Sequence, residues 1–374
     1  MTTSAFPLKP LHRFAGQNSA VRQPQEITCF SYDSSHKLRL DSSSLRYYYT
    51  PELNVPLSEG FETFIKHDDS VDEHLDSLLE ALIDLERRTG RKCSADIVTW
   101  RGMMTKFMSL PFNMRDGFEM LATKFQDTIF IEEHHAYRQR TQGPTNKRGE
   151  IMSFWGYKFE TLSTLPSPWD DCPRSLIESR TSEVVSNEAQ FCSIVKTGFG
   201  PVRLILGGEV DAAWDARLPP PLHPSLDDPN PQPPTTIQHN YVELKTSKEI
   251  MNQRDDVAFE RKLQKFWAQS FLLGVGRVLV GFRDDDGILR SVREFDTQSI
   301  PTIAKRSGRN LWDGKLSIDF TTSVLKWILE TVVDDGVWLI RHRENGQVLE
   351  VERTDRSTFL SESFVKWRTG NSFS

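Results

Sequence analysis

The feature that most constrains the fold is a pair of short acidic motifs, each within an apolar stretch that predicts a β-strand. Residues 202–213 carry Glu209-Val-Asp211, and residues 241–246 carry Glu243-Leu-Lys245. Side chains two apart in a strand point to the same face, so Glu209 and Asp211 are expected to point together. Adjacent carboxylates repel each other unless a cation compensates them. The pattern therefore predicts two neighbouring strands whose polar faces form one site.

Each motif alone has an ordinary explanation. The first can be a solvated strand face, and the second a surface salt bridge between Glu243 and Lys245. Together they match what a two-metal phosphoryl hydrolase requires. Carboxylates hold Mg²⁺ or Mn²⁺, and a lysine places a compact positive charge beside the phosphate or the attacking water. The arrangement resembles the PD-(D/E)XK nuclease superfamily.

The remaining pattern mixes helices and strands without strict βαβ alternation, which predicts an α+β fold. We expect a mixed central β-sheet flanked by helices, with a PD-(D/E)XK nuclease-like core. A capping box, Ser70 to Glu73, predicts the start of a helix that Gly90 stops. Further helices are predicted over residues 254–273 and 323–333. Strands are predicted over residues 27–32, 45–49, 118–123, 128–132 and 277–283, with a hairpin of 337–341 and 347–351 around Asn345-Gly346.

We expect residues 1–374 to form one domain. Residues 1–25 are polar and predict an irregular N-terminal arm. Residues 217–238 contain eight of the chain's 20 prolines and predict a surface loop within the domain.

Composition excludes several classes of protein. The net charge of −6 argues against a general nucleic-acid coat, although a local basic channel is compatible with it. The four cysteines form no C-x-x-C pair, so neither a zinc site nor a disulfide framework is indicated. No apolar run approaches membrane-spanning length, and no phosphate-binding G-x-x-x-x-G-K-[ST] loop is present.

Over most of its length the chain resembles the DXO-type RNA decapping family. That family includes a fungal protein that partners the nuclear 5′→3′ exoribonuclease. The matching stretches follow the family's order along the chain. They are Glu26–Asp33, Ser44–Tyr48, Val98–Gly102, Gly156–Glu160, Phe191–Val195, Gly208–Asp211, Glu243–Lys245, Trp267–Phe271 and Val280–Arg283.

The resemblance implies roles for individual residues. The implied metal ligands, for two ions of Mg²⁺ or Mn²⁺, are Glu160, Glu209, Asp211, Glu243 and the Leu244 carbonyl. Glu209, Asp211, Glu243 and Lys245 are the implied catalytic residues. The implied substrate contacts are Arg46, Glu73, Trp100, Arg101, Gly102, Cys192, Glu209, Lys245 and Gln269.

Four of these residues have competing explanations. Arg101 can be a charge on a helix surface, although the neighbouring glycine allows close approach of a ligand. Glu73 is also the last position of the capping box. Cys192 can be a buried thiol that only touches substrate, and Gln269 can hydrogen-bond a backbone group.

The implied activity is metal-dependent hydrolysis at RNA 5′ ends. It would remove incomplete caps, nicotinamide-dinucleotide caps and the pyrophosphate of 5′-triphosphate RNA, with NAD as a substrate group. Implied partners are RNA 5′ ends and a nuclear 5′→3′ exoribonuclease, and the implied location is the nucleus. One alternative is a non-catalytic activator of that exoribonuclease. Another is a DNA-cleaving member of the superfamily, which is disfavoured because Trp100–Gly102 and Gly156–Glu160 fit the decapping family better.

Overall fold

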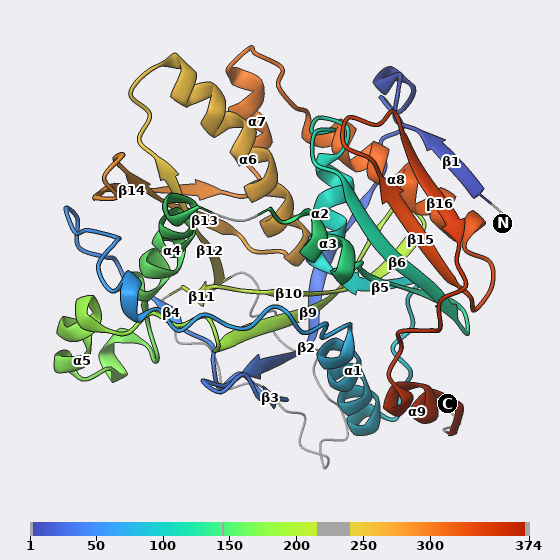
Figure 1. Ribbon diagram of the computed structural model, residues 1–374, viewed down its shortest axis with the longest axis horizontal. Coiled ribbons are helices and arrows are strands. Elements are labelled where there is room, and N and C mark those ends of the chain that lie inside the picture. Colours follow the sequence, from blue (N-terminus) through green and yellow to red (C-terminus); the bar gives the residue numbers. More distant parts are fainter. Residues whose placement is uncertain (1–2, 144–145, 215–239, 371–374) are drawn as a thin grey trace.

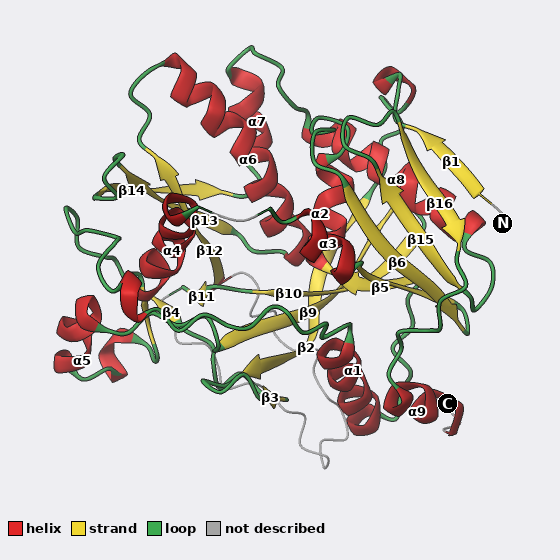
Figure 2. Ribbon diagram, in the orientation of Figure 1, coloured by secondary structure: helices red, strands yellow, loops and turns green. Residues whose placement is uncertain are grey.

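The computed structural model describes residues 3–143, 146–214 and 240–370. The proline-rich stretch predicted over residues 217–238 lies outside the described residues. The α+β class is confirmed, and the described strands divide between two sheets rather than one (Figure 2). Among the described residues, no helix is long and apolar enough to cross a membrane.

The larger sheet is mixed, because β5 runs parallel to both its neighbours while the other pairs are antiparallel. Its strands, in spatial order, are β1 (Thr3–Pro7), β16 (Val348–Arg353), β15 (Val337–His342), β6 (Phe118–Phe125), β7 (Thr128–Glu133), β5 (Ile97–Trp100), β10 (Val202–Glu209), β9 (Gln190–Phe199), β2 (Val21–Tyr32) and β3 (Leu38–Arg39).

The smaller sheet carries the second acidic motif. Its strands, in spatial order, are β14 (Leu289–Asp296), β13 (Arg277–Arg283), β12 (Tyr241–Lys248), β11 (Ala212–Ala213), β4 (Tyr47–Tyr48) and β8 (Thr164–Leu165). The strand β12 lies between β13, to which it is parallel, and β11, to which it is antiparallel.

Helices cover both faces of the larger sheet (Figure 1). The helices of the described chain are α1 (Asp76–Thr89), α2 (Arg101–Ser109), α3 (His135–Thr141), α4 (Lys147–Leu162), α5 (Arg174–Glu178), α6 (Gln253–Leu273), α7 (Ile300–Arg306), α8 (Gly314–Thr331) and α9 (Glu362–Gly370). Of these, α4 packs on the smaller sheet.

Side chains that alternate along β10 pack against helices on both faces of the larger sheet. Leu204 and Leu206 enter the core shared with α2, α6 and α8, while Ile205 enters the core shared with α1 and α9. A strand buried on both faces needs apolar residues at consecutive positions, and Leu204, Ile205 and Leu206 supply them in the middle of β10. A third core lies between α4 and the smaller sheet, where Phe159 packs with Val242.

Most predicted elements are confirmed. The strand β13 has the predicted bounds, β6 pairs with β7, and β15 pairs with β16 around Asn345. The predicted helix over 254–273 is α6, which Asn252 caps by accepting from two backbone N–H groups. It ends at Gly274, whose φ of 74° favours glycine.

Two local predictions were wrong. The arm over residues 1–25 contains β1 and the start of β2, because Thr3–Pro7 pairs with β16 at the far end of the chain. The capping box does not start α1, which begins only at Asp76. The Asp72 carboxylate accepts from the His74 N–H in a turn, and His74 has a φ of 50°, so a helix cannot continue through it.

Candidate active site

The first acidic motif lies where the chain passes from one sheet to the other. The predicted strand 202–213 is divided, because β10 ends at Glu209 and Ala212 begins β11 of the smaller sheet. In the register of the two sheets, Glu209 is opposite Cys192 of β9, and Ala212 is opposite Val242 of β12. The short crossing therefore brings Glu209 and Asp211 next to the second motif.

Asp211 and the second motif are in direct contact. The Leu244 N–H donates to Asp211 Oδ2 at 2.5 Å. Lys245 Nζ lies 2.7 Å from Glu243 Oε1 and 3.8 Å from Asp211 Oδ2. Within a strand, the N–H and C=O of one residue point to the same side. The Leu244 carbonyl consequently faces the same edge of β12 as the N–H that binds Asp211.

Glu160 lies in the last turn of α4, which packs on the smaller sheet. Burial raises the pKa of the Glu160 carboxyl well above its ordinary value, and the neighbouring Asp211 and Glu209 raise it further. Burial also raises the pKa of Asp211, to about 7, against the opposing charge of Lys245. These shifts place the four carboxylates, including Glu243, within electrostatic reach of one another.

Two cations hold Glu243 in its ionised form. Burial would raise the pKa of Glu243, but Lys245 and Arg101 outweigh it and lower the pKa. Burial would lower the pKa of Lys245, but the Glu243 and Asp211 carboxylates outweigh it and raise the pKa. Glu243 and Lys245 are therefore both charged over the physiological pH range.

Arg101 opens α2 directly after β5 and reaches across β10. Its Nη1 lies 3.4 Å from Glu243 Oε1, and its Nη2 donates to the Glu209 carbonyl at 3.3 Å. Two glycines allow this approach. A Cβ added at Gly207 would lie 2.8 Å from the Trp100 ring, and one at Gly208 would lie 2.9 Å from Arg101 Cβ. A larger residue at Gly207 would press on Leu78 and Trp100, and one at Gly208 would press on Leu273 and Arg101.

The donor set suits a hard divalent cation. Glu243 is 1% exposed, and its Oε2 has no hydrogen-bond partner among the described residues. A buried carboxylate oxygen without a partner is costly, and a cation would satisfy it. Carboxylate and carbonyl oxygens are the ligands that Mg²⁺ and Mn²⁺ prefer. Glu160, Glu209, Asp211, Glu243 and the Leu244 carbonyl supply such oxygens.

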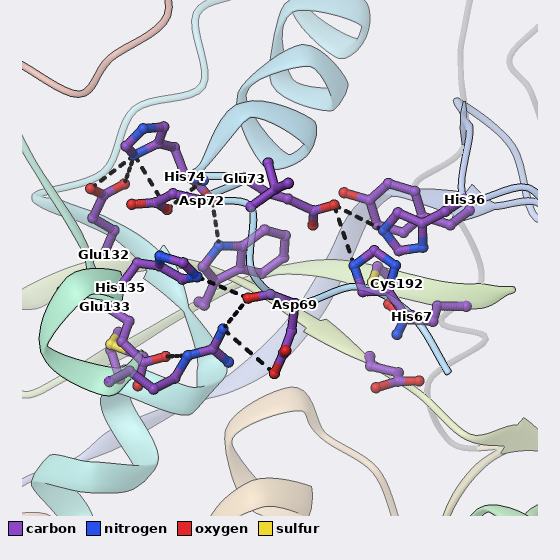
Figure 3. A pocket seen from close by; sticks show the side chains of 17 residues that line it. His36, His67, Asp69, Asp72, Glu73, His74, Glu132, Glu133, His135 and Cys192 are labelled. Atoms are coloured by element: carbon purple, nitrogen blue, oxygen red, sulfur yellow. Dashed lines mark hydrogen bonds and ion pairs between the residues drawn. The ribbon is translucent and has the colours of Figure 1, made fainter. Parts of the chain in front are cut away.

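A cavity of about 370 Å³ opens beside Glu209 (Figure 3). It brings together four predicted site residues that are far apart in the sequence: Glu73, Trp100, Cys192 and Glu209. Glu73 Oε1 lies 3.0 Å from His36 Nε2 rather than capping a helix. Burial raises the pKa of the Cys192 thiol, and the Glu209 charge adds to the effect, so this thiol stays protonated.

Three other predicted residues lie outside that cavity lining. Arg46 is held by Thr164, whose Oγ1 accepts from its Nε at 2.7 Å. The Gln269 side chain is half-buried on α6 and makes no hydrogen bond to any described residue, so the backbone contact considered for it is not formed there. A Cβ at Gly102 would meet nothing within 4 Å, so this glycine borders open space.

No pattern in the sequence indicated the histidines that surround the cavity. His36 stacks on Tyr32 and on His67, with ring centroids 4.0 and 3.7 Å apart. Across the cavity, His74 Nδ1 lies 3.1 Å from Glu132. Two groups bring possible metal ligands within 4.8 Å of one another; they are His36, His67 and Glu188, and Asp72, His74 and Glu132. Each group joins at least two distant segments of the chain, so no local motif marks it.

Comparison with known proteins identifies the family. The model of the "RAI1 like PD-(D/E)XK nuclease" family matches residues 22–365. The chain belongs to this family. The Neurospora crassa protein named "Decapping nuclease RAI1" is 50% identical to it over 98% of this chain and 87% of that protein.

Solved structures of the RAI1 family share the fold. Candida albicans Rai1, crystallised with pU5 and Mn²⁺, is 31% identical, with a TM-score of 0.87 over 99% of this chain and all of that chain. Scheffersomyces stipitis Rai1, crystallised with (3′-NADP)⁺ and a calcium ion, is 29% identical, with a TM-score of 0.83 over 94% of this chain and 97% of that chain. The predictions of family, fold class and a decapping hydrolase are confirmed by these matches.

Proposed function

We propose that this protein is a metal-dependent hydrolase of RNA 5′ ends. Its substrates are incompletely capped RNA, NAD-capped RNA and 5′-triphosphate RNA. The observation that carries the proposal is the grouping of four carboxylates with Lys245 and Arg101 beside a cavity. Membership of the RAI1 family supports it, as do the RNA oligomer and Mn²⁺ bound to the Candida albicans relative.

The metal ligands in this proposal are Glu160, Glu209, Asp211, Glu243 and the Leu244 carbonyl, for two ions of Mg²⁺ or Mn²⁺. Bound divalent ions supply a hydroxide nucleophile at neutral pH and neutralise charge on the phosphate. The raised pKa values of Glu160 and Asp211 support this assignment, because these carboxyls need a cation to ionise together.

Two cationic side chains position the phosphate. Lys245 stays protonated beside Glu243 and presents a compact charge to the phosphate or to the attacking water. Arg101 is nearly buried, with 11% of its side chain exposed, and its planar guanidinium can bind two phosphate oxygens. Because both contact Glu243, they are already oriented before RNA arrives, which lowers the cost of reaching the transition state.

The cavity of about 370 Å³ beside Glu209, called the first cavity below, receives the group at the 5′ end of the RNA. Trp100 offers an aromatic face, Glu73 and Cys192 line the walls, and Gly102 leaves room for close approach. Gln269, whose amide has no described partner, contacts the first nucleotides together with Arg46. Pyrophosphate, a cap dinucleotide and NAD are then products of one hydrolytic reaction at different bonds. The position of the RNA 5′ end over the carboxylates decides which bond is hydrolysed.

Product analysis tests the proposal. Triphosphate, unmethylated-cap and NAD-capped RNAs are incubated with the protein, with and without Mn²⁺, and the products are separated. We expect pyrophosphate, cap dinucleotide and NAD respectively, in Mn²⁺ only. The variant Glu209→Ala/Asp211→Ala should release none of them, and unchanged release by that variant would refute the site.

We also propose that the protein acts in the nucleus and binds a nuclear 5′→3′ exoribonuclease. The support is family membership alone, and the carboxylates are dispensable for this role. Retained exoribonuclease binding by the Glu209→Ala/Asp211→Ala variant, with hydrolysis lost, would show that the two functions are separable.

A further inference from the structure

A second cavity, of about 260 Å³, lies at the carboxyl-terminal ends of β12 and β13. The beginnings of α4 and α6 complete its walls. Four cationic side chains line it, and they are Arg148, Lys248, Lys262 and Arg283. Arg283 ends the Val280–Arg283 stretch, to which the proposed function gives no role.

Three of these cations lack a carboxylate partner. Lys248 pairs with Asp285 at 2.9 Å. Among the residues that the structure describes, Arg148, Lys262 and Arg283 form no ion pair. Lys262 Nζ reaches only the Ser247 hydroxyl, at 3.3 Å. Arg148 donates to a backbone carbonyl at 3.2 Å. The lining also includes the carboxylates of Asp255 and Asp285, so four cations face two carboxylates and the wall carries an excess of positive charge.

Arg283 is the unusual member, because it is buried. It is 7% exposed, its guanidinium lies 4.1 Å over the Trp155 ring, and its Nε has no hydrogen-bond partner among the described residues. Burial lowers the pKa of Lys262, and the nearby Arg283 charge lowers it further. A buried arginine with an unused donor beside a second unpaired cation is costly, and a bound anion would relieve both costs.

The cavity lies further along β12 from the candidate active site. Ser247 lines it and lies two residues beyond Lys245, so both side chains are on the same face of the strand. The strand rise puts these two residues about 7 Å apart. In the register of the parallel pair, Arg283 lies opposite Lys248, at the edge where ligands of such sheets bind.

The first cavity, which the proposed function assigns to the 5′ group, is a poor path for the RNA backbone that follows. Its walls include the carboxylates of Asp69, Asp72, Glu73, Glu132 and Glu133, and Arg138 is its one permanently charged cation among the described residues. Single-stranded nucleic acid is usually held in a positively charged groove that follows the backbone. The contrast in charge between the two cavities favours the second for the RNA chain.

We propose that the second cavity binds a backbone phosphate of the RNA, downstream of the hydrolysed linkage. Lys262, Arg148 and Arg283 supply the contacts. The inference rests on the proposed function, because it assumes that the 5′ end lies at the carboxylates. The same phosphate chemistry would also suit released pyrophosphate, so the test must separate these two sources.

The test measures binding without turnover. A 5′-phosphorylated oligouridine with a 3′ fluorophore is titrated with the protein in Ca²⁺ at several salt concentrations. Replacing Lys262 by glutamine should weaken binding and reduce the slope of log Kd against log salt by about 0.7, the value for one phosphate contact of a single strand. The double variant Arg148→Gln/Lys262→Gln should reduce the slope by about twice that amount. Lys326→Gln, an equal change of charge on the exposed face of α8, should leave the slope unchanged.

The outcomes are distinguishable. If wild-type protein does not bind the RNA at all, the proposed function fails as well. If it binds RNA and Lys262→Gln keeps the full salt slope, only the assignment of this cavity is overturned. Inorganic pyrophosphate is titrated separately in the same buffer. If Lys262→Gln keeps the full salt slope for RNA but loses the pyrophosphate binding of wild type, the cavity holds the leaving group, and the RNA assignment is overturned.

Discussion

Replacing Asp211 by asparagine should stabilise the metal-free protein and weaken its response to metal. Burial raises the pKa of Asp211 from its ordinary 3.8 to about 7. Only 10% of the side chain is exposed, so solvent screens the effect little. At 1.36 kcal/mol for each pKa unit, the ionised carboxylate costs about 4 kcal/mol of folding free energy above pH 7. Asparagine removes this charge and keeps an oxygen for the Leu244 N–H.

The pH window follows from the direction of the shift. Below about pH 3.8 the carboxyl is protonated in both folded and unfolded chains. Between about pH 3.8 and 7 the unfolded chain releases the proton and the folded chain keeps it, so stability falls as pH rises. Asp211→Asn should therefore resemble wild type near pH 4. Near pH 8, in EDTA, its melting temperature should be higher by roughly 5 °C.

Adding Mn²⁺ should narrow this difference in stability. A ligand that binds only the folded state stabilises by about 2.7 kcal/mol at a concentration of 100 times Kd. Wild type should gain that stability, and Asp211→Asn should gain little of it. Thermal melts in EDTA and in Mn²⁺, at both pH values, check the prediction. A variant that is less stable than wild type in EDTA near pH 8 would refute the electrostatic reasoning.

Three further predictions concern the same site. Gly208→Ala should disturb Arg101, lower the free energy of unfolding by about 1–3 kcal/mol and greatly reduce kcat. Gly102→Ala should raise the free energy of unfolding by about 0.5–1 kcal/mol and raise KM for RNA. Thermal melts and steady-state kinetics distinguish the two variants. Arg101→Lys should lower kcat/KM at least about tenfold, since a lysine cannot contact both Glu243 and the Glu209 carbonyl; an unchanged value would contradict its role. Calorimetry in buffers of different ionisation enthalpy should show that the protein releases protons when Mn²⁺ binds below about pH 7. If no protons are released, Asp211 is already ionised in the metal-free protein.

The local acidic motifs could be found from the sequence because their chemistry is local. Strand periodicity alone puts Glu243 and Lys245 on one face, and the structure has them 2.7 Å apart. Periodicity also predicts β13 and α6, whose apolar residues repeat at the spacing of a strand and a helix. The resemblance to the decapping family supplied Glu160 and Arg101, which no local pattern connects to the carboxylates.

The parts that sequence reasoning missed depend on contacts between distant segments. The pairing of Thr3–Pro7 with β16 and the ion pair of Glu73 with His36 join residues that no local pattern relates. The division of residues 202–213 between two sheets depends on β12 and β9, which flank the crossing. The role of Gly207-Gly208 is visible only once Trp100 and Arg101 are seen against β10. The prediction of a single domain over residues 1–374 stays a prediction.

Anomalous diffraction from crystals soaked in Mn²⁺ tests the central claim most directly. The account predicts anomalous peaks in coordination contact with Glu160, Glu209, Asp211, Glu243 and the Leu244 carbonyl. The two histidine-containing groups of the first cavity serve as an internal comparison, because their possible ligand atoms lie within 4.8 Å of one another. Peaks at those groups alone, with none at the four carboxylates, would contradict the account.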